Sequence, residues 1–154
     1  MKVGLIGYGR FAKLREQCLI HSDVLDVEVV GYFDPYCNDE KLKRFSTVES
    51  FLDKVDAVII SVPPSLAPGY VQLSLEAGKN VFCEKPAAIS SDNLREIDED
   101  LSQSKVLAYG FNHRVHPSVI KMKQVIDGKK LGNILWMRGR YGKEVDDSYS
   151  NTWR

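Results

Sequence analysis

Residues 2–12 read KVGLIGYGRFA, in which a short apolar run leads through two glycines into a helical pattern. Gly7 would permit a tight turn, Gly9 would let a pyrophosphate approach the backbone, and Ala12 is small enough for a helix to pack on the strand. The N-terminus of that helix favours the phosphate charge. This GxGxxA pattern between a strand and a helix predicts a dinucleotide site. The alternative is a turn that merely needs two glycines.

The rest of the chain alternates short apolar runs with helical patterns. Strands are expected at Lys2–Ile6, Val27–Phe33, Ala57–Val62, Asn80–Cys83, Lys105–Phe111 and Ile134–Arg140. Helices are expected at Phe11–Ile20, Lys41–Arg44, Thr47–Lys54, Gly69–Ala77, Ser91–Gln103 and Pro117–Ile126. The side chains expected on the inward face of the first helix are Phe11, Leu14, Cys18 and Leu19. This alternation predicts an α/β fold with a doubly wound, mostly parallel Rossmann sheet and helices on both faces.

The composition argues against several classes of protein. Of the 154 residues, 21 are basic and 21 acidic, so no basic excess favours binding to nucleic acid. The longest uncharged run, residues 57–75, contains three prolines, which argues against a membrane span. The three cysteines, Cys18, Cys37 and Cys83, are widely spaced and form no CxxC pair, so neither a disulfide framework nor a metal site is expected. The start of the chain lacks a signal-peptide pattern, which makes the cytoplasm the expected location.

Asp34 ends the second expected strand, 25 residues beyond Gly9. A carboxylate at this spacing can accept hydrogen bonds from the adenosine ribose, and it would repel the extra phosphate of NADP. NAD is therefore the favoured cofactor and NADP the less favoured one. No Lys or Arg stands at position 35 or 36, and Tyr36 could stack near the adenine. The alternative for Asp34 is an Asp-Pro turn.

Two further loops follow buried strands. Ser61, Val62 and Pro63 stand at the end of the first, where their backbone would line the nicotinamide side of the cofactor. The alternative is a strand that proline simply terminates. Glu84-Lys85-Pro86 follows the next strand. A lysine there could hydrogen-bond a substrate hydroxyl and stabilise it as its proton leaves, whereas the alternative is a surface ion pair.

The chain as a whole resembles the N-terminal half of the Gfo/Idh/MocA oxidoreductases. The resemblance covers residues 1–142 and rests on GYGRFA, Asp34, AVIISVPP, EAGKNVFCEKP and GFNHRVHP. It implies NAD(P)-dependent oxidation or reduction at a sugar, nucleotide-sugar or cyclitol group, with Lys85 as the catalytic residue at the reacting carbon. The cofactor-binding residues that it implies are Gly7, Tyr8, Gly9, Arg10, Phe11, Asp34, Ser61, Val62, Pro63, Glu84, Lys85, Asn112 and Arg114.

Length is the main departure from this family, whose members are usually far longer. Their second domain supplies an open sheet and, typically, an Asp and a His that act at the substrate. Here residues 1–117 are expected to form the NAD-binding domain, and 118–154 a linking helix and the start of a truncated second domain. Residues 134–140 would be its first strand. His113 and His116 are the local candidates for accepting the hydroxyl proton, but solvated or structural roles are expected for both. The chain alone is therefore expected to be catalytically incomplete.

Two other functions stay open at this stage. The chain could be a stand-alone, non-catalytic NAD-binding or regulatory module, or a Rossmann-like domain for another ligand such as a methyl donor. GxGxxA followed by Asp34 and EKP argues against the methyl donor. Without its sheet, the last strand would expose Trp136, Met137 and an unpaired edge. We therefore expect a homo-oligomer formed through this segment, with a sugar or cyclitol as the small-molecule partner once a second domain is supplied.

Overall fold

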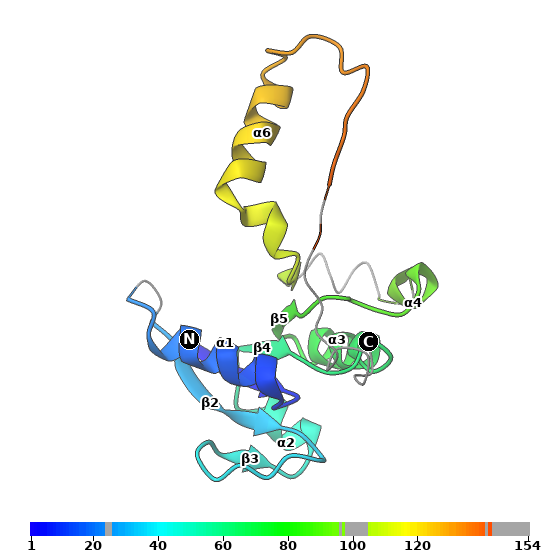
Figure 1. Cartoon of the computed structure of the whole chain (residues 1–154). Helices are drawn as coiled ribbons and strands as arrows, with labels where there is room; N and C mark the ends of the chain where they lie inside the picture. The colour runs from blue at the N-terminus through cyan, green and yellow to red at the C-terminus, as the bar shows by residue number, and fades with distance from the viewer. Residues whose placement is uncertain (24–25, 96, 98–104, 141, 143–154) are drawn as a thin grey trace. The chain divides into compact units, whose positions relative to one another are not determined.

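The computed structural model describes residues 1–23, 26–95, 97, 105–140 and 142 (Figure 1). The chain divides into two compact units, Met1–Asn112 and His113–Arg154. The later part of the helix expected at 91–103 lies outside the described residues. Among the helices that are described, none is long and apolar enough to cross a membrane.

The first unit is built on a six-stranded sheet in which every pair of neighbours runs parallel. Its strands are β1 (Lys2–Ile6), β2 (Glu28–Phe33), β3 (Arg44–Phe45), β4 (Ala57–Ile60), β5 (Asn80–Cys83) and β6 (Leu107–Tyr109). They lie in the order β3-β2-β1-β4-β5-β6, which is the doubly wound Rossmann order. The switch point lies between β1 and β4, so the carboxyl ends of these strands form the expected ligand edge.

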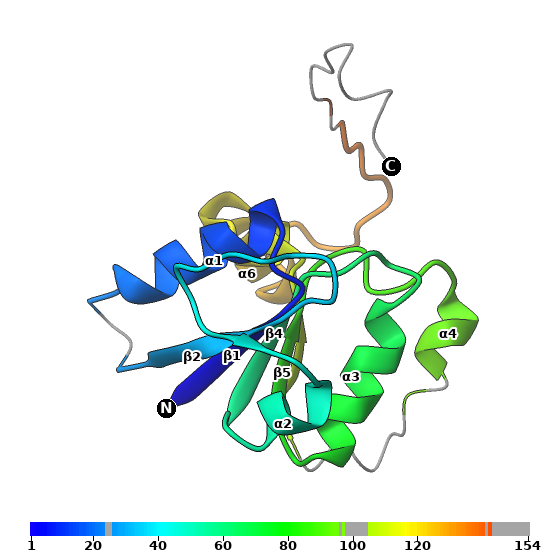
Figure 2. The same ribbon diagram turned by 90° about the horizontal axis from the view of Figure 1, so that it is seen from below.

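Helices cover both faces of this sheet (Figure 2). The helical segments are α1 (Arg10–Ile20), α2 (Val48–Leu52), α3 (Ala67–Glu76), α4 (Ser91–Arg95), the 3-10 turn η1 (Asn112–Val115) and α6 (Pro117–Asp127). Helix α1 packs on one face of the sheet, and α2 and α3 pack on the other. The sheet is therefore buried on both sides, as the continuous apolar strands predict.

Alternate side chains of each strand enter two separate cores. On the α1 face, Leu5 packs in one cluster with Ala12, and both are fully buried. On the opposite face, Ile6 packs with Phe51 of α2 and Val71 of α3. The period of two along each strand thus places one apolar residue in each core.

The inward face of α1 is not the one that the sequence pattern predicts. Its buried residue is Ala12, and Leu19 is partly buried. The expected inward residues that are exposed are Phe11, Leu14 and Cys18. The Arg15 guanidinium lies 5.3 Å from the centre of the Phe82 ring, so a long polar side chain occupies part of the inner face. The small Ala12 lets the helix approach β1, and this approach determines the rotation of the helix.

Two expected elements are replaced by other structure. Residues 41–43 form a turn rather than a helix, and β3 follows them at the edge of the sheet. The Tyr32 N–H donates to the Lys43 carbonyl at 2.9 Å, which draws this segment towards β2. Residues 134–140 form no strand, because no described strand pairs with them and a strand needs a hydrogen-bonded neighbour.

Candidate functional site

The turn after β1 ties three strand ends together. Gly7 has a φ of +80°, and its N–H donates to the Phe33 carbonyl at 2.9 Å. A Cβ at Gly7 would lie 2.5 Å from the Ser61 carbonyl oxygen, so this position requires glycine. A Cβ at Gly9, in contrast, would meet nothing within 4 Å. Gly7 therefore serves the fold, whereas Gly9 leaves open space beside the backbone.

The N-terminus of α1 offers backbone N–H groups to an anion. Gly9 is the N-cap residue, and no side chain caps the helix. The N–H groups of a first helical turn have no partner within the helix, and the helix dipole favours negative charge there. Arg10 and Phe11 are exposed in this turn, which contains no acidic residue. This end of α1 therefore suits a phosphate group.

Three backbone N–H groups fix the Asp34 carboxylate. Its Oδ2 accepts a hydrogen bond from Tyr8 N–H at 2.7 Å. Its Oδ1 accepts hydrogen bonds from the N–H groups of Tyr36 at 2.8 Å and Cys37 at 3.0 Å. The Asp-Pro turn considered as the alternative is thus present, and it orients the carboxylate towards the glycine turn. A carboxylate has about four acceptor positions, so capacity remains for a ribose hydroxyl.

A cavity of about 240 Å³ opens between the ends of β1, β2 and β4 and the start of α3. The residues expected from the sequence that line it are Gly7, Gly9, Asp34, Tyr36, Ser61, Val62 and Pro63. The structure therefore brings together the glycine turn, the acidic residue and the SVPP loop.

Leu66 and Tyr70 also line this cavity, and the sequence reasoning missed both. Burial, and next the negative charge of Asp34, raises the pKa of Tyr70. No motif marks either residue. The one available signal was their place at the start of the helix that follows the two prolines.

The chemistry of this cavity fits a dinucleotide. The Ser61 Oγ is buried and has no hydrogen-bond partner among the described residues. Such a group costs free energy unless a partner satisfies it, and Ser61 belongs to the cavity lining. The open space at Gly9, the uncapped N-terminus of α1 and the fixed Asp34 carboxylate are the groups through which the cavity can bind a polar ligand.

The Tyr8 side chain points away from the cavity. Its ring stacks on Tyr32 with 4.1 Å between ring centres, and its hydroxyl donates to Glu16 Oε2 at 2.5 Å. Burial, followed by the hydrogen bond to Glu16, raises the pKa of the Tyr8 hydroxyl. Only the backbone of Tyr8 therefore reaches the site, where its N–H already binds Asp34.

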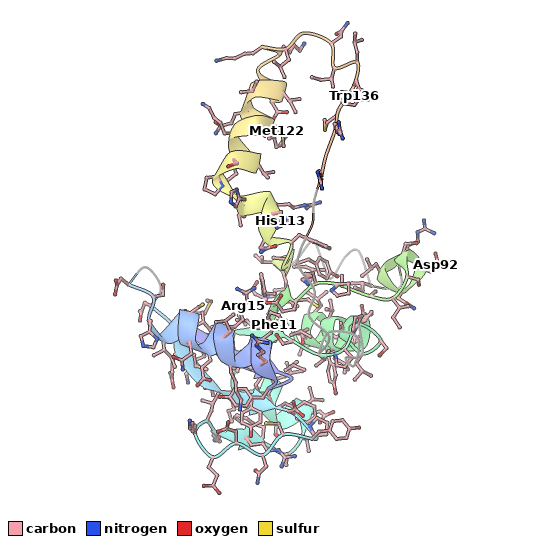
Figure 3. The ribbon with its side chains drawn as sticks, in the orientation of Figure 1. Phe11, Arg15, Asp92, His113, Met122 and Trp136 are labelled. Atoms are coloured by element: carbon pink, nitrogen blue, oxygen red, sulfur yellow. The ribbon has the colours of Figure 1, made fainter. Side chains whose placement is uncertain are left out.

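Glu84 is held by α1. Its Oε1 accepts a hydrogen bond from Arg15 Nε at 2.6 Å, and the Glu84 side chain is 14% exposed. Figure 3 shows Arg15 projecting from α1. A Cβ at Gly110 would lie 2.9 Å from Glu84 Oε2, so this carboxylate also fills the space beside the end of β6. The ion pair holds the turn that leads to the next residue, Lys85.

Lys85 is exposed at the tip of β5 and is joined to Pro86 by a cis peptide bond. Within the part of the chain that the structure describes, its ammonium forms no hydrogen bond or ion pair. Strand β5 pairs with β4, and the loop after β4 lines the cavity. The ammonium is therefore available on the same edge of the sheet.

The remaining predicted residues lie in and around η1. Asn112 is exposed, and its N–H donates to the Gly110 carbonyl at 3.0 Å. Arg114 is exposed and belongs to the second unit, so its cofactor role stays a prediction. His116 is the N-cap of α6, where its Nδ1 accepts the Ser118 N–H at 3.3 Å. Capping the helix is a structural role, which is one of the two roles expected for His116 from the sequence.

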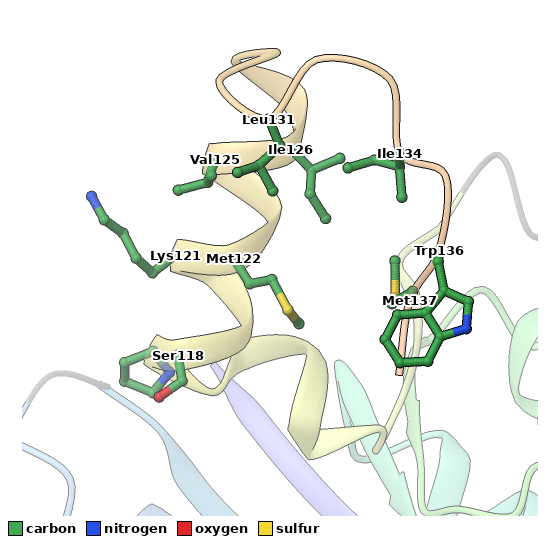
Figure 4. Close-up of a pocket in the computed structure, with 10 residues that line it drawn as sticks. Ser118, Lys121, Met122, Val125, Ile126, Leu131, Ile134, Trp136 and Met137 are labelled. Atoms are coloured by element: carbon green, nitrogen blue, oxygen red, sulfur yellow. The ribbon is translucent and has the colours of Figure 1, made fainter. Parts of the chain in front are cut away.

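The second unit contains a larger cavity, of about 690 Å³ (Figure 4). It is lined by Pro117, Ser118, Lys121, Met122, Val125, Ile126, Leu131, Ile134, Trp136 and Met137. Apolar side chains of α6 face those of the segment that follows it. One charged group and one hydroxyl do not provide the converging polar groups that a dinucleotide needs. We therefore place the candidate site in the first unit.

The fold and this site define the class of the protein, which is an NAD-binding Rossmann domain. The Gfo/Idh/MocA family, described as oxidoreductases with an NAD-binding Rossmann fold, matches residues 1–113. The chain belongs to this family, as the resemblance in its motifs implies.

Similar proteins are dehydrogenases of carbohydrates and cyclitols. Glucose-6-phosphate 3-dehydrogenase of Bacillus subtilis (strain 168) is 30% identical over 150 residues, which are 92% of this chain and 42% of that protein. Inositol 2-dehydrogenase of Rhizobium meliloti (strain 1021) is 26% identical over 87% of this chain and 43% of its own. The solved structure of UDP-N-acetylglucosamine 3-dehydrogenase from Acidithiobacillus ferrooxidans is similar with a TM-score of 0.70 and 25% identity, over 81% of this chain and 43% of that one. The chain thus spans less than half the length of each.

Proposed function

We propose that this chain is the cofactor-binding part of a dehydrogenase that acts on a sugar, nucleotide-sugar or cyclitol hydroxyl or keto group. The observation that carries the proposal is the cavity shared by the fixed Asp34 carboxylate and the open glycine turn at the uncapped start of α1. Asp34 would accept the adenosine ribose hydroxyls, and the N-terminus of α1, with Arg10, would bind the pyrophosphate. NAD bound there supplies the hydride acceptor, and NADP is the less favoured cofactor.

Lys85 is the proposed catalytic residue of this chain. Its exposed ammonium at the tip of β5 would hydrogen-bond the substrate hydroxyl and stabilise it as the proton leaves. Glu84 would hold the turn through Arg15, and Asn112 and Arg114 would complete the cofactor site.

The substrate class rests on the names of similar proteins. A hexose phosphate, an inositol and a nucleotide sugar share a ring that carries several hydroxyl groups. Oxidation at one ring carbon is the reaction that their names have in common. We therefore propose a ring secondary alcohol, or the matching ketone, as the reacting group.

We assign residues 1–117 to the NAD-binding domain and 118–154 to a linking helix and the start of a second domain. Since the chain spans less than half of the similar proteins, the group that accepts the hydroxyl proton is proposed to lie in that second domain. The 154 residues alone would then bind cofactor without completing the reaction.

A titration of the purified chain with NADH and NADPH tests the cofactor site. We expect saturable NADH binding that is tighter than NADPH binding, because Asp34 accepts ribose hydroxyls and repels a phosphate. Asp34→Ala should weaken NADH binding about tenfold or more, since hydrogen bonds to a charged group are worth about 1.5–3 kcal/mol. Asp34→Asn keeps an oxygen that can accept the N–H groups of the turn. It therefore distinguishes loss of the charged ribose contact from loss of binding through misfolding.

Asp53→Ala is the matched control, because Asp53 is an exposed aspartate at the end of α2. It should leave NADH binding unchanged. The proposal fails if neither cofactor binds, or if Asp34→Ala and Asp53→Ala bind NADH equally well.

We propose self-association through the second unit as the oligomeric state. Leu135, Trp136 and Met137 are 93%, 76% and 66% exposed, and such a patch favours contact with a partner. Side chains would make the contact, since residues 134–140 form no strand. Light scattering should give a dimer or larger mass that Trp136→Ser lowers and the first-unit control Val106→Ser does not. A monomeric mass for the unaltered chain at high concentration would rule this out.

We propose the cytoplasm as the location. Cys18, Cys37 and Cys83 are free thiols. Free thiols suit a reducing compartment, because disulfides form and persist in oxidising ones. Recovery of the native protein from a secreted or membrane fraction would contradict this location.

A further inference from the structure

Arg44 lies beside the residues that would hold the adenosine ribose. It is the first residue of β3, the edge strand that pairs with the end of β2 (Figure 1). Its Nε donates to the Asp34 carbonyl and its Nη2 to the Pro35 carbonyl, each at 3.1 Å. Asp34 and Pro35 both line the cavity of the first unit. The two hydrogen bonds therefore anchor a guanidinium at the rim of the ribose site.

This guanidinium has donors to spare. Arginine carries five N–H donors, and two of those on Arg44 bind the carbonyls. The side chain is exposed and forms no ion pair with the described carboxylates. An anchored, exposed guanidinium with free N–H groups is well suited to a phosphate, which arginine can bind through two parallel hydrogen bonds.

Two other cations near this edge are already engaged. The Lys13 ammonium pairs with Asp39 at 2.6 Å, and the Lys43 ammonium lies 4.8 Å from the centre of the Phe45 ring. Among the described residues, Arg44 binds only neutral carbonyls, so its positive charge is not cancelled by these contacts.

The Asp34 carboxylate does not oppose a phosphate at full strength. Three backbone N–H groups donate to it and partly offset its negative charge. An adenosine 2′-phosphate would thus meet a carboxylate whose repulsion is weakened by three N–H donors on one side, and the Arg44 guanidinium on the other.

We propose that Arg44 determines how well the site accepts a 2′-phosphate, so that the protein binds NADPH measurably although NADH remains the tighter ligand. The inference rests on the proposed function and extends it to the choice of cofactor. In Rossmann domains that take NADP, an arginine near the ribose accommodates the 2′-phosphate. Here that arginine comes from the next strand rather than from the residues directly after Asp34.

The test is a titration of the whole chain and its variants with NADPH and NADH at low ionic strength. Arg44→Ala should weaken NADPH binding about tenfold or more and change NADH binding less than about twofold, since charge-assisted hydrogen bonds to the phosphate are lost. Arg44→Lys keeps the charge without the planar fork and should retain part of the NADPH affinity. Lys43→Ala removes a neighbouring cation and is the matched control.

A second pair of probes isolates the phosphate. Adenosine 2′,5′-bisphosphate and 5′-AMP differ only in the 2′-phosphate, and Arg44→Ala should weaken the first and spare the second. Added salt should reduce this difference, because it screens an exposed charge.

Equal loss for NADH and NADPH, no loss, or an equal loss in Lys43→Ala would overturn the role of Arg44. The absence of NADPH binding in a chain that binds NADH would overturn it as well. Failure of the unaltered chain to bind NADH would instead defeat the proposed function on which the inference rests, so the two failures are distinguishable.

Discussion

Gly7 and Gly9 stand two residues apart in one turn and meet different demands. Gly7 has a positive φ and lies against the Ser61 carbonyl, so its conformation and its contacts both exclude a side chain. Gly9 has an ordinary φ of −79° and faces open space. The two glycines belong to one fingerprint in the sequence, whereas the structure separates a folding role for Gly7 from the open space at Gly9, where we propose that pyrophosphate binds.

Gly7→Ala should lower the free energy of unfolding by about 1–3 kcal/mol, because Ala would be strained at a positive φ and would clash with the Ser61 carbonyl. Urea denaturation measures this loss. An unchanged unfolding midpoint would show that the turn can relax around the extra methyl group.

Gly9→Ser should leave stability unchanged or raise it slightly, since Ser is a favoured N-cap residue. It should weaken NADH binding several-fold, because its side chain would occupy the open space and its hydroxyl would bind the N–H groups meant for pyrophosphate. Denaturation and NADH titration of the same preparation separate the two effects. Equal NADH affinity in both chains would place the pyrophosphate elsewhere.

Short helices and edge strands of this domain depend on local capping and on their neighbours. In α2, the Thr47 side chain accepts the Ser50 N–H at 3.2 Å, so Thr47 caps the helix. In β3, only two residues pair with β2, and the local sequence favours a helix instead. A threonine at the start of a helix is a local signal, whereas a two-residue strand depends on a partner that is distant in the chain.

Thr47→Ala should cost about 1 kcal/mol of unfolding free energy, because an N–H of the first turn of α2 loses its acceptor. Thr47→Ser keeps the hydroxyl oxygen and should cost much less. Thermal or urea denaturation of the three chains measures the difference. If Ala and Ser are equally tolerated, the cap contributes little and packing of Phe51 holds the helix.

The core of the first unit contains a buried thiol, Cys83, which stays uncharged in the folded protein. Burial, and next the negative charge of Glu84, raises the pKa of Cys83 to about 12. The thiol lies at the end of β5 in the core shared with α2 and α3. Its ionisation is therefore linked to unfolding of the domain.

The free energy of unfolding should fall as the pH rises above about 9. Between about 9 and 12 the thiol loses its proton in the unfolded chain and keeps it in the folded one, so the unfolded state binds fewer protons and gains stability. The slope for one group is at most about 1.4 kcal/mol per pH unit. Urea denaturation from pH 8 to about 9.5 tests this before most tyrosines of the unfolded chain lose their protons. Cys83→Ala should make the slope smaller, and an equal slope in that variant would assign it to other groups, such as Tyr8, whose pKa burial also raises.

Local patterns in the sequence were sufficient to predict most of the fold and half of the site. In runs such as AVIISV and KVGLI, successive side chains enter the two apolar cores in turn. Runs that are apolar on both faces are typical of buried parallel strands. Gly7, Gly9, Asp34 and the SVPP loop each end or follow a strand, and parallel strands bring their carboxyl ends to one edge. For these residues, position in the pattern is enough to predict position in space.

Only the tertiary structure decided which distant groups share the cavity and which faces are buried. Tyr70, from the helix after β4, lines the same cavity as Asp34, and Arg44 of β3, ten residues beyond Asp34, donates to the Asp34 carbonyl. The rotation of α1 buries Ala12 instead of Phe11, because close packing on the sheet outweighs the apolar pattern. The sequence by itself determined the βαβ frame and its ligand edge, since both follow from the alternation of strand and helix patterns along the chain. The contacts around Asp34 depend on strand order, which is a property of the assembled sheet.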